Sequence, residues 1–342
     1  MGAAGLDDAP FGQVAFAGTA EAGPAPRADP DNLPGMRMAP GSEDQGSGLG
    51  ATRGRPELGG AMTAPARLQA DDLPLPAVEA ALERACGMAL SSGARPALGE
   101  AVRRAARELG LAREPYLSRL LDGEPAAVTA LVEQAVVGET CFYRHPEQVA
   151  ALARHLASLP PALPVSAWSA GCASGEEAYT LAMVLRDLGR PAGRDRVLGT
   201  DVSARALEVA REGRYGEWSL RQLPAALRAR HFTADGEAVR VIEPLRAPVR
   251  FERHNLLGPA PLGAPFDLVV CRNVLLYFKP EAARALLGRL HGALRPGGLL
   301  LVGPIEEPLA AGLPFERLEE PGSGLLRRPA TPCAAGRGGG EP

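Results

Sequence analysis

The sequence predicts an α/β fold: a doubly wound, mainly parallel sheet with helices on both faces, preceded by a small all-helical unit. After Pro164, short apolar runs alternate with amphipathic helical segments, as is typical of such sheets. From Leu75 to about Val137, apolar residues recur at helical spacing without strand-like runs. Asp235-Gly236, between two strand-like runs, is a strong hairpin signal and predicts a small antiparallel insertion.

The size and composition of the chain limit the classes of protein to consider. It has 342 residues, 46% of them hydrophobic, and a formal net charge of −3. This length is enough for one large domain or two modest ones, and the near-neutral charge gives no reason to expect nucleic acid as the main partner. The five cysteines lie far apart and form no CxxC pair, which argues against a metal site or a disulfide framework and fits a reducing cytoplasm. Because the N-terminus lacks signal-peptide features and no apolar run approaches the ~20 residues of a membrane helix, we expect a cytoplasmic protein that is not inserted in a membrane.

Composition and periodicity divide the chain into two tails and two domains. Residues 1–72 and 327–342 are rich in Gly, Pro and Ala and contain few large apolar residues, so we expect both to be disordered tails. Residues 73–137, punctuated by Gly and Pro, predict a helical domain of three or four helices. Its arginines form either a basic face or an ordinary solvated face: Arg103, Arg104, Arg107 and Arg113.

Residues 138–326 are predicted to form the α/β domain. Ser203 is placed to cap its second helix, and Pro280 lies in the first turn of its last helix. The antiparallel insertion is expected at about residues 215–251. The other predicted elements are strands at 165–170, 196–201, 249–252, 266–274 and 299–303, and helices at 176–189, 203–213 and 280–294.

The stretch SAGCASGEEAYT, residues 169–180, joins the first strand of this domain to its helix and has the character of a ligand loop. Gly171 and Gly175 would let the backbone pass close to a ligand. Glu176 and Glu177 would repel a pyrophosphate at the helix N-terminus, and the spacing matches neither a dinucleotide fingerprint nor a P-loop. A cationic or hydroxyl-rich ligand therefore suits the loop better, unless the two glutamates only complement the helix dipole.

Polar side chains also follow three later strands. Asp201 ends the second strand, where an acid typically accepts hydrogen bonds from ribose hydroxyls, although it is also a candidate helix cap. Asn255 and Asn273 can both donate and accept, as an adenine edge or an amino-acid group requires, but each alone is as easily a turn residue. Together these residues indicate a nucleoside held without a phosphate and beside a positive charge, which fits the sulfonium of S-adenosylmethionine.

Five segments in series carry a resemblance to a known family. GETCFYRHPEQ, WSAGCASGEEAYTLAMVL, GTDVSARALEVAREGRYGEW, RFERHNLL and FDLVVCRNVLLYF together resemble the bacterial chemotaxis methyltransferases of the CheR type, over roughly Leu75 to Leu326. The resemblance implies a Rossmann-like methyltransferase fold that uses S-adenosyl-L-methionine as cofactor. It also implies methylation of glutamate side chains of chemoreceptor cytoplasmic domains, as glutamyl methyl esters, in chemosensory signalling.

The resemblance also implies roles for individual residues. In the family, the segment matching ETCFYR closes over the cofactor, the β insertion can dock on receptors or their tails, and the helical unit presents basic residues to acidic receptor helices. Arg272 and Tyr277 are candidates for orienting the acceptor carboxylate, with packing as the alternative for Tyr277. Because a carboxylate is already ionised near pH 7, no catalytic triad and no metal are expected. The implied cofactor contacts are Thr140, Arg144, Glu176, Glu177, Asp201, Asn255, Leu256, Asn273 and Val274.

The sequence departs from the family pattern at several positions. Gly138 stands where the family usually has Asn, which removes one amide near the cofactor, and Tyr143 replaces a Phe. The stretch Gly303-Pro-Ile-Glu-Glu307 differs from the more usual Gly-His-Ser-Glu. Two other functions therefore stay open: a methyltransferase for another acceptor, such as a small molecule, and a non-catalytic cofactor- or receptor-binding module.

Removal of residues 1–70 is expected to leave cofactor binding intact, because a segment that buries little apolar surface adds little to a fold. Calorimetry with S-adenosylhomocysteine on the full and truncated chains should give the same dissociation constant. A large loss of affinity in the truncated chain would show that the segment is part of the folded protein.

Overall fold

The structure is a computed structural model that describes residues 74–89, 95–318 and 323–330. The tail predicted at 1–72 lies outside the described residues. The tail predicted at 327–342 starts too early, because Arg327 ends strand β10 (Leu325–Arg327) and pairs with Leu299 of the main sheet. Residues 331–342 of that tail lie outside the described residues.

Four helices form the helical unit: α1 (Leu75–Cys86), α2 (Arg95–Glu108), α3 (Arg113–Leu121) and α4 (Pro125–Ala135). Pro125 occupies the first turn of α4, where its missing N–H costs nothing. The four arginines of the predicted basic face make ion pairs or hydrogen bonds within this unit. For example, Arg103 forms an ion pair with Glu100, and Arg104 donates to Gln134 Oε1 at 2.9 Å. The apolar stripes of the helices meet in one core that includes Val78, Leu82, Leu98, Val102, Tyr116, Leu120 and Leu131.

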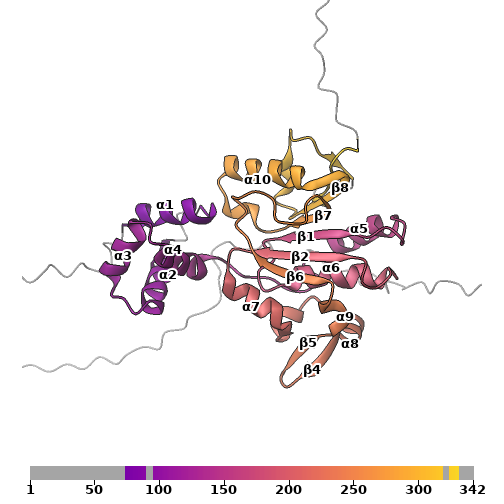
Figure 1. Cartoon of the computed structure of the whole chain (residues 1–342), viewed down its shortest axis with the longest axis horizontal. Coiled ribbons are helices and arrows are strands. Elements are labelled where there is room, and N and C mark those ends of the chain that lie inside the picture. The colour runs from indigo at the N-terminus through magenta and orange to yellow at the C-terminus, as the bar shows by residue number, and fades with distance from the viewer. Residues whose placement is uncertain (1–73, 90–94, 319–322, 331–342) are drawn as a thin grey trace, which may run out of the picture. The chain divides into compact units, whose positions relative to one another are not determined.

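The α/β domain is built on a seven-stranded sheet in the order β6-β2-β1-β7-β8-β10-β9, and Figure 1 shows the first five of these strands side by side. Adjacent strands among those five are parallel. Strand β10 is antiparallel to β8, and β9 (Glu316–Arg317) is antiparallel to β10. The chain runs outward from β1 in one direction and then, from β7, in the other. The carboxyl ends of β1 and β7 therefore flank the point where the strand order reverses, the usual ligand position in such sheets. The parallel strands are β1 (Ser166–Ala170), β2 (Arg196–Asp201), β6 (Val249–Arg253), β7 (Phe266–Cys271) and β8 (Leu294–Val302).

Helices cover both faces of this sheet, as predicted. The alternation of β7 shows why its apolar run is continuous: Leu268 and Val270 face the core shared with α5 and α6, whereas Val269 faces the core shared with α10. Helix α5, which the sequence analysis did not predict, begins at a proline and fills the first of these cores. The helices that cover the sheet are α5 (Pro146–Ala157), α6 (Glu176–Asp187), α7 (Ala204–Glu212) and α10 (Pro280–Ala293). A membrane-spanning helix would have to be longer and more apolar than any helix in the described residues.

The antiparallel insertion is present, with β5 (Ala238–Val241) between β3 (Arg214–Tyr215) and β4 (Phe232–Asp235). Its hairpin turn contains Gly236 at φ +64°, a conformation that glycine adopts without strain. The predicted end of the insertion at 251 is too late, because β6 already pairs with β2 from Val249 onward. Three short helices complete this region: η2 (Glu217–Leu220), α8 (Ala225–His231) and α9 (Glu243–Arg246).

Candidate active site

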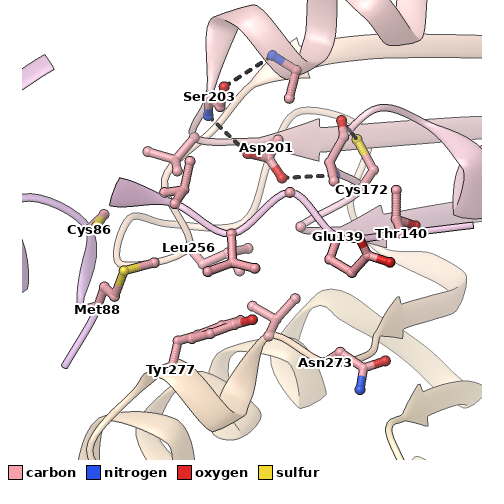
Figure 2. Close-up of a pocket in the computed structure, with 18 of the residues that line it drawn as sticks. Cys86, Met88, Glu139, Thr140, Cys172, Asp201, Ser203, Leu256, Asn273 and Tyr277 are labelled. Atoms are coloured by element: carbon pink, nitrogen blue, oxygen red, sulfur yellow. Dashed lines mark hydrogen bonds between the residues drawn. The ribbon is translucent and has the colours of Figure 1, made fainter. Parts of the chain in front are cut away.

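A cavity of about 310 Å³ lies at the carboxyl ends of β1, β2, β6 and β7, within the size range of small-molecule sites. Figure 2 shows Asp201 and Ser203 on one side of it, Tyr277 and Asn273 on the other, and Leu256 between them in this view. Glu176 does not line this cavity. The other ten predicted site residues do: Thr140, Arg144, Glu177, Asp201, Asn255, Leu256, Arg272, Asn273, Val274 and Tyr277.

The glycines of the loop after β1 let the loop pack closely against neighbouring protein atoms, and Gly171 also lines the cavity. Gly171 and Gly175 have φ values of +83° and +96°. A Cβ on Gly171 would lie 2.6 Å from Val274 Cγ2, and one on Gly175 would lie 2.8 Å from Ala210 Cβ. Gly171 N also donates to the Thr200 carbonyl at 2.8 Å, which ties this loop to the end of β2. The glycines therefore allow the loop to pack tightly against the neighbouring strand ends.

The two glutamates that start α6 point to different places. Glu176 is 2% exposed and accepts hydrogen bonds from Ser174 Oγ at 2.7 Å and Ser219 Oγ at 2.8 Å, so it holds the insertion against α6. Burial raises the pKa of Glu176, and these hydrogen bonds offset part of the shift. Glu177 turns to the cavity side, where it accepts from Ser169 Oγ at 2.7 Å.

Arg272 is the ionic partner of Glu177, with its Nε 2.9 Å from Glu177 Oε2. Its Nη1 donates to the Arg144 carbonyl and lies 3.4 Å from Gln148 Oε1. The guanidinium therefore joins the end of β7 to α6 and to the segment before α5.

By contrast, Tyr277 is half-buried and its hydroxyl makes no hydrogen bond within the described residues. Burial raises the pKa of Tyr277, which keeps the phenol protonated and able to donate.

Asp201 joins the loop after β1 to the residue that caps α7, and its expected role as a ribose acceptor stays a prediction. Its Oδ2 accepts from Ala173 N and its Oδ1 from Ser203 N, both at 2.9 Å. Ser203 is the N-cap of α7, as predicted, since its Oγ accepts from Ala206 N at 3.0 Å. Burial raises the pKa of Asp201, and the backbone hydrogen bonds lower it again in part. A carboxylate has about four acceptor positions, so Asp201 retains capacity for hydroxyl donors in the cavity.

The two asparagines differ in how far their amides are occupied. Asn255 Nδ2 donates to the Ala85 carbonyl of α1 at 2.6 Å, and its Oδ1 accepts from Leu257 N at 3.0 Å. Asn273 has φ +58°, and its buried Oδ1 has no hydrogen-bond partner within the described residues. Burial lowers the pKa of the neighbouring His145, and interaction with the Asn273 amide raises it in part. The Asn273 amide is therefore a buried group whose polar neighbour is His145.

The helical unit supplies part of the cavity wall, which the sequence analysis missed. Cys86 and Met88 line the cavity, and Ala89 N donates to the Tyr277 carbonyl at 2.7 Å. Glu133 of α4 accepts from Ser203 Oγ at 2.5 Å and from Ala204 N at 2.7 Å, so the helical unit helps to cap α7. Glu133 and Ser203 are 70 residues apart in the chain, and no local pattern marks such a pair.

The segment from Gly138 to Arg144 crosses the cavity and is anchored to the insertion. Phe142 packs edge-on against Tyr215, with ring centroids 4.8 Å apart. Arg221, also missed from the sequence, bonds to Glu139 Oε1 at 2.6 Å and to the Thr140 carbonyl at 3.2 Å. A Cβ on Gly138 would meet no atom within 4 Å, so the structure has room for a side chain at this position.

These residues fit an S-adenosyl group. Asp201 accepts only backbone N–H groups within the described part of the chain, which leaves its charge without a cationic partner. Leu256 and Val274 provide an apolar wall of the cavity. Buried acids and amides of this kind favour a hydroxyl-rich cation over a diphosphate.

Comparison with known proteins gives a consistent result. Residues 138–317 match the family model described as CheR methyltransferase, SAM binding domain. A probable biofilm formation methyltransferase WspC of Pseudomonas aeruginosa is 36% identical over 256 residues, which cover 73% of this chain and 61% of that protein. The chemotaxis protein methyltransferase of Klebsiella aerogenes is 32% identical over 248 residues, or 70% and 85% of the two chains. Chemotaxis protein methyltransferase 1 of Pseudomonas aeruginosa is 30% identical, over 66% of this chain and 86% of that protein. The chain therefore spans less than two thirds of the WspC relative.

Asp201→Asn is expected to weaken binding of S-adenosylhomocysteine by roughly 10- to 100-fold, because a hydrogen bond to a charged group is worth about 1.5–3 kcal/mol. Calorimetry measures the affinity. The matched control is Asp267→Asn, since Asp267 also accepts a backbone N–H, from Ser166 at 2.8 Å, but lies near the amino end of β7, away from the cavity. Equal affinity losses in both variants would remove Asp201 from the binding site.

Proposed function

The chain belongs to the CheR methyltransferase family, and from this premise we propose that it transfers a methyl group from S-adenosylmethionine to glutamate carboxylates of chemoreceptor-like proteins. The products would be glutamyl methyl esters formed in chemosensory signalling in the cytoplasm. The relatives named chemotaxis protein methyltransferases support this class of acceptor. The proposed division of the chain keeps residues 73–137 as a helical domain and extends the catalytic domain from 138 to 327, the end of β10.

One observation carries the proposal: the acid of the cavity, Asp201, accepts only backbone N–H groups within the described residues. A carboxylate that has no cationic partner attracts a ligand that carries donors and a positive charge. S-adenosylmethionine has both: ribose hydroxyls and an ammonium group as donors, and a sulfonium as the charge.

The cavity residues divide the proposed tasks among them. Asp201 accepts hydrogen bonds from the ribose hydroxyls, and Asn273 Oδ1 accepts from the amino group. Arg144 is half-buried at the cavity, and its guanidinium is proposed to bind the cofactor carboxylate while Nη1 keeps its bond to the Glu139 carbonyl at 2.8 Å. Leu256 and Val274 are proposed to flank the adenine with apolar surface.

The reaction asks the protein for alignment and desolvation rather than for proton transfer. When bound, S-adenosylmethionine supplies a methyl group on a positive sulfur, which leaves as a neutral thioether when an acceptor carboxylate oxygen takes the methyl carbon. A glutamate is already ionised near pH 7, so no general base is needed. The Tyr277 hydroxyl, free of protein partners in the described chain, is proposed to orient the acceptor carboxylate while the surrounding apolar wall excludes water.

The activity is tested with a radiolabelled methyl donor and a panel of receptor cytoplasmic fragments. Label that is released from a fragment by mild base marks a carboxyl ester and is the expected result. Asp267→Asn should label as well as the original chain, whereas Asp201→Asn should not. Label that is stable to base would point to a nitrogen acceptor and contradict the proposal.

Gly138→Asn is expected to tighten binding of S-adenosylhomocysteine by several-fold, because the structure has room for a side chain there and an added amide can hydrogen-bond a ligand in the cavity. Calorimetry on both proteins measures the change. Gly138→Ala, which adds a side chain without a polar group, is the control; an equal gain from alanine would assign the effect to backbone stiffening instead.

A further inference from the structure

The loop after β8 buries two adjacent glutamates, Glu306 and Glu307, which are only 1% and 2% exposed. Burial of a carboxylate is costly unless donors surround it. Glu307 accepts from Gly324 N at 2.8 Å and is ion-paired with Arg317, so it serves the local packing of the sheet edge. Glu306 has different partners: every hydrogen bond recorded to its carboxylate comes from a backbone N–H.

The N–H groups that donate to Glu306 lie just after the ends of two strands, β7 and β8. Glu306 Oε2 accepts from Asn273 N at 2.7 Å and from Gly303 N at 2.8 Å. Its Oε1 accepts from Leu276 N at 3.3 Å. One carboxylate therefore joins the chain that leaves β7 to the chain that leaves β8, directly beside the cavity.

The backbone at Asn273 is stabilised by this contact. Its φ of +58° lies in the left-handed region, which among residues other than glycine is adopted mainly by Asn and Asp. A conformation of this kind persists when the surroundings over-determine it, and it often occurs at binding sites. The hydrogen bond from Asn273 N to a buried charged acceptor provides that constraint, because charge-assisted hydrogen bonds are the stronger ones.

We propose that Glu306 is a positioning residue that holds the backbone of Asn273 so that this residue keeps its place in the wall of the cofactor cavity. This inference rests on the proposed function, because it assigns the ligand of Asn273 to S-adenosylmethionine. Glu306 does not line the cavity, whereas Asn273 does. Its effect on the ligand is therefore exerted through the loop.

Gly303 supplies a second, independent way to disturb the same contact. A Cβ on Gly303 would lie 2.5 Å from Glu306 Oε2 and 3.3 Å from Asn273 N. A methyl group there must push the carboxylate away from its donors. Gly303→Ala should therefore reproduce the effect of a change at Glu306 while leaving the glutamate in the chain.

The test compares Glu306→Gln with Glu307→Gln, the same substitution at an equally buried neighbour. S-adenosylhomocysteine affinity, KM for the methyl donor and the melting temperature are measured for each. Glu306→Gln and Gly303→Ala should each weaken affinity about tenfold and raise KM more than they lower kcat. Glu307→Gln should lower the melting temperature with less than about a twofold change in affinity. A purely structural role, in which both glutamine variants melt earlier and bind equally well, would overturn the inference.

A double-mutant cycle locates the effect at Asn273. In an Asn273→Ala background, Glu306→Gln should add less than about a twofold loss, because its route to the ligand is gone. A full additional loss would refute the positioning role.

Hydrogen exchange of residues 271–277 without ligand separates this inference from the proposed function. Exchange should quicken in Glu306→Gln and not in Glu307→Gln. If the unmodified chain failed to bind S-adenosylhomocysteine, the proposed function would fail. Faster exchange in Glu306→Gln would still support the backbone constraint. Unchanged exchange in Glu306→Gln would overturn that constraint.

Discussion

The buried ion pair between Arg272 and Glu177 is the interaction on which the geometry of the cavity depends. The two side chains are 3% and 11% exposed, and loss of either would leave the other charge unpaired, at a cost of about 3–5 kcal/mol. Because Arg272 also donates to the Arg144 carbonyl, one guanidinium fixes β7, α6 and the segment before α5 at once. The cost of burying the pair is offset by these added hydrogen bonds, and the result is a rigid floor for the site.

Acids build the rim of the cavity, and they do so by binding backbone N–H groups. Asp201 holds the loop after β1 and the start of α7, Glu133 caps α7, and Glu306 ties the end of β7 to that of β8. Each carboxylate satisfies donors that a loop would otherwise leave exposed at a strand end. The same arrangement concentrates negative charge where the strands end, which suits a cationic ligand and disfavours a diphosphate.

Much of the fold follows from local pattern. The alternation after Pro164 predicts the strands and helices of the sheet, Asp235-Gly236 predicts the hairpin, and Ser203 predicts the start of α7; the structure confirms each. Helix α5 was missed, although Pro146 and the apolar spacing after it are helix signals.

The site was harder to predict than the fold. Glu176 and Glu177 are about 100° apart around α6, so only one can face the cavity, and periodicity alone does not say which. Glu133 was not predicted because its partner Ser203 is 70 residues away in the chain. Glu306 lies in the stretch 303–307 that was compared with the family pattern, but no role was predicted for it because its partner Asn273 is 33 residues away. Ten of the predicted side chains do meet at one cavity, because the carboxyl ends of neighbouring parallel strands share an edge.

The helical unit contacts residues of the cavity region just after the ends of three strands, β6, β2 and β7. Ala85 accepts from Asn255, Glu133 caps the helix after β2, and Ala89 donates to Tyr277. Binding equilibria that share such contacts are thermodynamically linked, and linkage is reciprocal. A ligand that displaced α1 or α4 would therefore change the contacts that Asn255, Ser203 and Tyr277 make beside the cavity.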